Sequence, residues 1–261
     1  MSSITINRRD VSEEAGILDY LERGGKLTSP DNAPPRYRAE LMRMMASFVD
    51  SEMAGAAGFA DCINQGPGVT ERIAASRIVL EKLDHAERVL KIMGEFGANT
   101  ARYETVHPWA ARVGRDEDIG ATRRGGDMRL NVFHYPLAGW TDAVTMNVLM
   151  GCATVVQLGE LSRVSYQPLG ETFRDILPRE TRHAELGEEG LAKIASEGAA
   201  GKDEIARSVD YWRRRVGATL GGAASARADL LKRFGLRHES NETLKKAWDA
   251  AVDMSLGRAL G

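Results

Sequence analysis

The sequence has few of the features that mark secreted, membrane or nucleic-acid-binding proteins. It contains only two cysteines, Cys62 and Cys152. They cannot form a disulfide framework, so a reducing cytoplasm is the expected compartment. The 35 basic and 37 acidic side chains nearly cancel, leaving a formal net charge of −2. No overall field attracts the protein to nucleic acid or to an anionic membrane, and we expect neither as a partner.

Aromatic residues and long hydrophobic runs are also scarce. We expect no membrane span, because no apolar run approaches the ~20 residues that one needs. The N-terminus lacks the basic-then-apolar pattern of a signal peptide. Aromatics make up 6% of the chain, whereas Ala, Leu, Met, Glu and Arg are abundant. This composition favours helices and predicts an all-α protein.

Apolar residues recur at three- and four-residue spacing in four long segments. They form two helical hairpins, at residues 34–97 and 140–195, with turns at Gly66-Pro67-Gly68 and Tyr166-Gln167-Pro168. Two such hairpins predict a four-helix bundle. We expect further helices around 203–219 and 241–258, an irregular segment at 98–139, and a polar N-terminal arm at 1–33. The whole chain, 1–261, is expected to form a single domain.

Ionisable residues interrupt the apolar stripes of three of these helices. Glu52 lies on the first, Glu81 and His85 on the second, and Glu180 and His183 on the fourth. Glu180 and His183 form a Glu-x-x-His pair, whose spacing directs both side chains to one helix face. A carboxylate is rarely buried unless it is ion-paired or metal-bound. The pattern therefore indicates a polar site, and possible metal ligands, inside the bundle.

The spacing across the first hairpin supports this interpretation. Glu52 and His85 are 33 residues apart, and each is about half a helix from the turn, so they should face one another. Simpler explanations remain open at this point. A Glu-x-x-His pair can occur by chance on a surface helix, Glu52 could be a surface charge, and His85 could be a core histidine bonded to a backbone carbonyl.

The order and spacing of several motifs resemble the ferritin-like proteins of aerobic phenylacetate catabolism. Within that family the chain is most similar to the catalytic subunit of ring-1,2-phenylacetyl-CoA epoxidase. The matching segments are Tyr37-Arg38, Ser51-Glu52-Met53-Ala54-Gly55, the helix around His85, Phe133-His134-Tyr135-Pro136, Trp140-Thr141-Asp142, Ser165-Tyr166-Gln167-Pro168 and Glu180-Thr181-Arg182-His183.

The resemblance implies a ferritin-like bundle with accessory C-terminal helices and two irons per chain. Glu52, His85, Glu180 and His183 match the metal ligands of the family. The irons would activate O₂ to oxidise an aromatic or acyl-CoA substrate, so the expected activity is that of a multicomponent di-iron monooxygenase subunit. The resemblance also implies a reductase component and a homo- or hetero-oligomer with a homologous helical subunit.

Two family ligands are replaced in this chain. Lys82 stands where the second helix should supply a glutamate, and Gly151 where the third should supply an aspartate. A protonated lysine repels a metal cation and could instead pair with Glu52 or Glu180. The glycine is expected to leave a gap. Glu81 could replace the missing ligand on the second helix, and Gln157 or Glu160 the one on the third.

These replacements leave three functional hypotheses open. The first is the di-iron oxygenase, and the second is a non-catalytic scaffold subunit that has lost its ligands. The third is a metal-free enzyme that uses Lys82, because a lysine in a dehydrated core is expected to have a lowered pKa. Cys152, next to the glycine, is expected to be a small core residue, although a thiolate ligand is conceivable.

Overall fold

The computed structural model describes residues 8–103, 105–120, 126–222 and 226–261. It confirms an all-α fold in which helices make up 75% of the chain. The described residues contain no strand, and a β-bridge between Leu27 and Tyr166 ties the N-terminal arm to the turn before α6. The arm itself carries helix α1, Arg8–Glu22.

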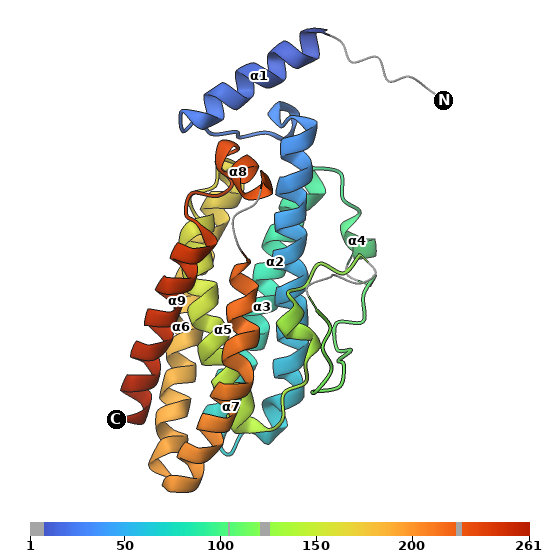
Figure 1. Ribbon diagram of the computed structural model, residues 1–261. Coiled ribbons are helices and arrows are strands. Elements are labelled where there is room, and N and C mark those ends of the chain that lie inside the picture. The colour runs from blue at the N-terminus through green and yellow to red at the C-terminus, as the bar shows by residue number, and fades with distance from the viewer. Residues whose placement is uncertain (1–7, 104, 121–125, 223–225) are drawn as a thin grey trace.

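The two expected hairpins form the centre of the fold. Helices α2 (Pro35–Cys62) and α3 (Val69–Glu95) pack along each other, as do α5 (Trp140–Leu161) and α6 (Gln167–Ser196). Figure 1 shows these four helices running roughly parallel to one long axis. Pro35 fits the first turn of α2, where its missing N–H is not needed, and Gly66 and Gly68 flank the turn into α3.

Helix α5 is enclosed by its neighbours. It packs against α6, α7 (Ala199–Gly217) and α9 (Asn241–Leu260), and residues 141–153 are all buried. Trp212 of α7 and Trp248 of α9 are fully enclosed packing anchors, as the sequence predicted. By length and composition α5 could cross a membrane, contrary to the expectation that no segment approaches that threshold. Its most apolar window is 67% buried inside the protein, as in a core helix.

The segment between the hairpins crosses the outside of α2. It contains short helices α4 (Thr100–Tyr103) and η3 (Asn131–His134). Asp50 of α2 anchors it by accepting hydrogen bonds from the Tyr103 hydroxyl at 2.5 Å and the Met128 amide at 2.6 Å. Ser51 accepts another from the Leu130 amide at 3.0 Å. Polar side chains beside the candidate site thus fix this segment to the bundle.

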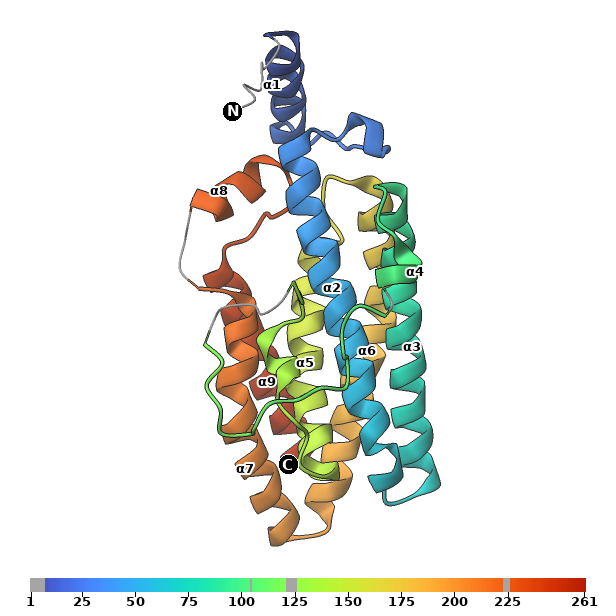
Figure 2. The same cartoon turned by 90° about the vertical axis from the view of Figure 1, so that its right-hand side faces the viewer.

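The C-terminal part adds elements that close one side of the bundle. The turn η4 (Ala218–Leu220) and helix α8 (Ala226–Arg233) lie between α7 and α9 in the chain. Figure 2 shows α8 beside the upper half of α2. Helices α7 and α9 lie near their predicted positions, whereas α8 had no explicit prediction.

Candidate functional site

Five ionisable side chains from three helices meet in the middle of the bundle. Glu52 comes from α2, Lys82 and His85 from α3, and Glu180 and His183 from α6. All five are buried, with relative exposures between 0% and 7%. The interpretation of Glu52 as a surface charge is therefore wrong. The i, i+3 spacing on α3 and on α6 directs both members of each pair into the core.

Lys82 lies between the two carboxylates. Its ammonium nitrogen Nζ is 3.0 Å from Glu52 Oε1, 3.1 Å from Glu180 Oε1 and 3.3 Å from Glu180 Oε2. These are charge-assisted hydrogen bonds between buried partners. The ion pair that the sequence offered as an alternative to metal is present in the structure, to both carboxylates at once.

His85 completes the same cluster. Its Nδ1 lies 3.0 Å from Glu180 Oε1 and 3.3 Å from Glu52 Oε2, so its partners are carboxylates and not a backbone carbonyl. The other ring nitrogen, Nε2, is buried and has no hydrogen-bond partner. Metal-binding histidines almost always donate that second N–H to a carboxylate, carbonyl or water. None of the residues that the structure describes supplies such support behind His85.

His183 has the opposite arrangement. Its Nε2 lies 2.7 Å from Glu81 Oε2, on the outer side of the ring. Its Nδ1 faces the centre, 3.4 Å from Glu180 Oε1, without making a hydrogen bond. Glu81 therefore orients His183 from behind and does not enter the cluster as a substitute ligand.

The charges in the cluster shift one another's pKa values. Burial raises the pKa of Glu180, but Lys82, His183 and His85 outweigh it and hold that pKa well below the ordinary value. For Lys82, the largest single effect on the pKa is burial, which lowers it. Glu180 and Glu52 together outweigh burial and raise the pKa above its usual range. The expected lowering for a buried lysine is wrong here, because two carboxylates contact the amine. Lys82 is an ammonium ion and not a free nucleophile.

The pKa of His85 is also raised. Burial lowers it, but the contacts with Glu180 and Glu52 raise it by more. Both carboxylates therefore favour the charged form of His85, in addition to the ammonium of Lys82 that lies between them.

The donor set was tested against the metal that the resemblance implies. Glu52, His85 and Glu180 each offer one ligand atom, all within 4.8 Å of one another, so this cluster could hold one metal ion. The oxygens that would bind it already accept hydrogen bonds from Lys82. A metal ion would have to displace the ammonium.

The second expected metal position is closed by helix packing. A Cβ on Gly151 would lie 3.0 Å from the Cβ and 3.1 Å from the Cα of Ala184. The prediction that this glycine leaves a gap is wrong, since Ala184 of α6 lies directly against it. Position 151 supplies no ligand, and in the described part of the chain Glu52, His85 and Glu180 form the one group that could hold a metal ion.

Neither residue of α5 that could have replaced the missing metal ligand lies in the cluster. Glu160 pairs with Arg163 and accepts hydrogen bonds from the backbone amides of His238 and Glu239. Gln157 lies on the wall of a pocket. Burial raises the pKa of the Cys152 thiol to about 11, so it is a neutral core residue and not a thiolate ligand.

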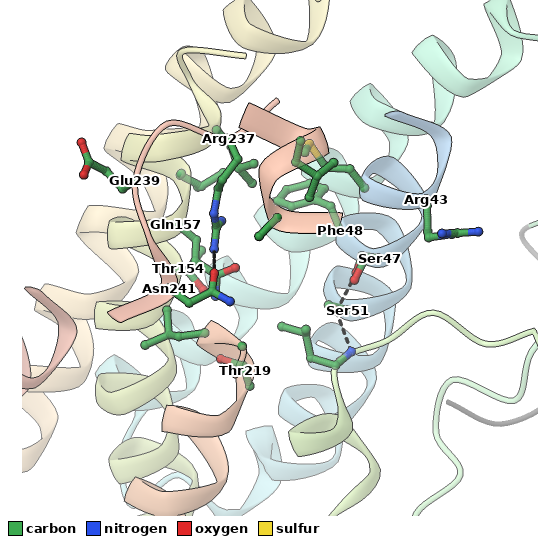
Figure 3. Close-up of a pocket in the computed structure, with 18 of the residues that line it drawn as sticks. Arg43, Ser47, Phe48, Ser51, Thr154, Gln157, Thr219, Arg237, Glu239 and Asn241 are labelled. Atoms are coloured by element: carbon green, nitrogen blue, oxygen red, sulfur yellow. Dashed lines mark hydrogen bonds between the residues drawn. The ribbon is translucent and has the colours of Figure 1, made fainter. Parts of the chain in front are cut away.

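Glu52 is one of the residues that line a pocket of about 780 Å³. Phe48 of α2 and Thr154 and Gln157 of α5 lie on its walls, with Thr219 of η4 at one side (Figure 3). Most of the remaining wall is apolar, formed by Met44, Leu130, Phe133, Met150, Leu158, Leu161, Leu220 and Leu231. Its volume is within the range that holds small organic ligands.

Four basic and four acidic side chains line this pocket: Arg43, Arg227, Lys232 and Arg237, and Glu52, Asp229, Glu239 and Glu242. Arg43 and Arg227 line it and share Glu40 as an ion-pair partner, while Lys232 lies nearby on α8. Arg237 donates to the amide oxygen of Asn241 at 2.5 Å (Figure 3). Burial lowers the pKa of Arg237, and Glu160 opposes this from a distance. A half-buried guanidinium with an amide as its hydrogen-bonded partner can bind an anionic group.

The sequence alone did not identify this pocket. Its residues come from α2, η3, α5, η4, α8 and α9, which are far apart in the chain. Arg237 follows α8 without any recognisable motif, so only the folded chain places it beside Gln157.

Comparison with known protein families gave one match. The family model described as "Phenylacetic acid catabolic protein" matches residues 18–260, nearly the whole chain. No curated protein matched significantly.

Proposed function

This chain belongs to the phenylacetic acid catabolic protein family, and we propose that it binds an aromatic or acyl-CoA compound as one component of an oxygenase system. The observation that carries this proposal is the open, largely apolar pocket that Glu52 helps to line. An aromatic acyl group matches the apolar walls, and Arg237 at the pocket offers a cation for a carboxylate or phosphate.

Other components would supply the redox chemistry. In this proposal a reductase delivers the electrons, and a homologous helical subunit carries the oxygen-activating centre. The assembly would work in the cytoplasm, consistent with two free buried cysteines. The role combines substrate binding with the scaffold hypothesis, because Lys82 already forms ion pairs with the two carboxylates that would bind a metal.

The proposal is tested by calorimetric titration with phenylacetyl-CoA, acetyl-CoA and phenylacetate. We expect phenylacetyl-CoA to bind, and Thr154→Phe, which narrows the pocket, to weaken binding at least tenfold. Arg213→Gln is the matched control, since Arg213 pairs with Asp249 and Asp253 between α7 and α9. Absence of binding by all three compounds, or equal binding by Thr154→Phe, would contradict the proposal.

A di-iron monooxygenase activity of this chain itself is the second candidate. It is favoured by the convergence of Glu52, His85 and Glu180, with His183 beside them. Bound iron would supply the O₂ activation, and these four residues would hold it. This candidate requires Lys82 to leave the cluster, and two irons per chain with reductase-dependent O₂ consumption would establish it.

A further inference from the structure

We propose that the ammonium of Lys82 permanently occupies the cation position of this bundle, so that the chain folds and keeps its centre without any metal. This inference goes beyond the proposed function and does not depend on which compound fills the pocket. It concerns what balances the charges of Glu52 and Glu180.

The first argument is the identity of the bonded atoms. Two carboxylates from different helices, 4% and 1% exposed, need a cation between them. Lys82 Nζ lies within 3.1 Å of an oxygen on each. The same carboxylates belong to the group that could hold a metal. One position is therefore available for a cation, and the lysine fills it.

The second argument is that the Lys82 ammonium and a metal ion cannot be bound to these carboxylates at the same time. An ammonium has three N–H donors and no lone pair, so it cannot be a ligand. A divalent ion bound to these oxygens would lie against the ammonium, where low polarity makes the repulsion strong. The ion pair and a bound metal are therefore alternatives.

The third argument is that the surroundings accommodate the lysine. Its stem lies against Gly55 of α2, where a Cβ would be 3.5 Å from Lys82 Cδ and 3.3 Å from Phe133. The stem therefore packs at ordinary van der Waals distance from α2. The missing support behind His85 Nε2 and the close contact of Gly151 with Ala184 also suit an ion pair better than a metal site.

The test compares metal binding and thermal unfolding in three variants. Lys82→Glu supplies the missing carboxylate, and Lys82→Met removes the cation. Lys91→Met is the matched control, an exposed lysine on the same helix that pairs with Glu87. Each protein is titrated anaerobically with Co²⁺ and Fe²⁺, and its melting temperature is recorded with and without metal.

We expect the wild type and Lys91→Met to bind no metal and to melt at the same temperature in its presence. Lys82→Met should melt about 10 °C lower, because it leaves two buried carboxylates without their cation. Lys82→Glu should bind at least one metal ion per chain and melt higher when loaded.

Stoichiometric metal binding by the wild type would overturn the proposal, and this measurement needs no variant to fold. Unchanged melting of Lys82→Met would overturn it as well. Failure of phenylacetyl-CoA to bind would contradict the proposed function and leave this inference intact.

Discussion

Gly151 of α5 and Ala184 of α6 lie so close that a Cβ on the glycine would be 3.1 Å from the Cα of the alanine. The same close approach continues along the helix pair. A Cβ on Gly187 would be 2.8 Å from Val148, and one on Gly190 would be 2.9 Å from Val144. Small residues therefore set the distance between α5 and α6 beside the candidate site.

This relationship predicts that Gly151→Ala destabilises the protein by about 1–3 kcal/mol, because the new methyl group would force α6 to shift at Ala184. Gly159→Ala is the control on the same helix, since a Cβ there meets nothing within 4 Å. That substitution should stabilise by up to about 1 kcal/mol through helix propensity. Urea unfolding measures both, and equal effects would contradict the packing argument.

Asp142 predicts a pH-dependent contribution to stability. It accepts hydrogen bonds from both terminal nitrogens of Arg115 at 2.8 Å and from the Trp212 indole at 2.9 Å. Burial raises its pKa, but Arg115 and the Ala138 amide, with help from Trp212, hold it below the ordinary value. A lowered pKa means that the stabilisation is present above the unfolded value, near 3.8, and is lost as the pH falls further.

Asp142→Asn should therefore cost about 3 kcal/mol at pH 7. The difference from the wild type should persist at pH 5 and narrow at pH 3. Chemical unfolding at the three pH values measures it. A difference that stays constant from pH 7 to pH 3 would show that the charge of Asp142 is not involved.

A double-mutant cycle tests the coupling of Lys82 to Glu52. Lys82→Met leaves two buried carboxylates without their cation, whereas Glu52→Gln removes one of the charges that need the lysine. The loss of unfolding free energy in the double variant should be smaller than the sum of the losses in the two single variants, by about 1–3 kcal/mol. Free energies of unfolding measured by urea titration give the coupling. Strict additivity would mean that the 3.0 Å contact contributes nothing.

The position of Arg237 at the pocket predicts that this residue contributes to the binding of an anionic ligand. Arg237→Gln should weaken phenylacetyl-CoA binding about tenfold, as expected for loss of a charge-assisted hydrogen bond. Glutamine keeps a hydrogen-bonding group and much of the side-chain volume, so the pocket should stay intact. Calorimetry measures the affinity beside the wild type. Unaltered affinity would remove Arg237 from the binding site.

The bundle was predictable because its signals are local. The three- and four-residue spacing and the Gly66-Pro67-Gly68 turn define both hairpins. The convergence of Glu52, His85, Glu180 and His183 in the core follows from the same periodicity. These features depend only on which face of a helix a residue occupies.

It was harder to predict from the sequence which side chain lies between Glu52 and Glu180. Successive residues on a helix differ by about 100°, so the pattern could not decide between Glu81 and Lys82. In the structure Lys82 enters the cluster and Glu81 contacts the outer nitrogen of His183. The space at Gly151 depends on the distance between two helices, which no local pattern encodes. The pocket likewise exists only in the folded chain, because α2, α5 and α8 each contribute residues to its wall.

The most direct test of the account is the metal content of the wild-type protein. Protein purified from iron-supplemented cells should be analysed by plasma mass spectrometry beside His183→Ala. Since Lys82 fills the cation position, we predict less than about 0.1 iron or other transition metal per chain in both. Close to two irons per chain in the wild type, lost in His183→Ala, would contradict the account and establish the di-iron oxygenase instead.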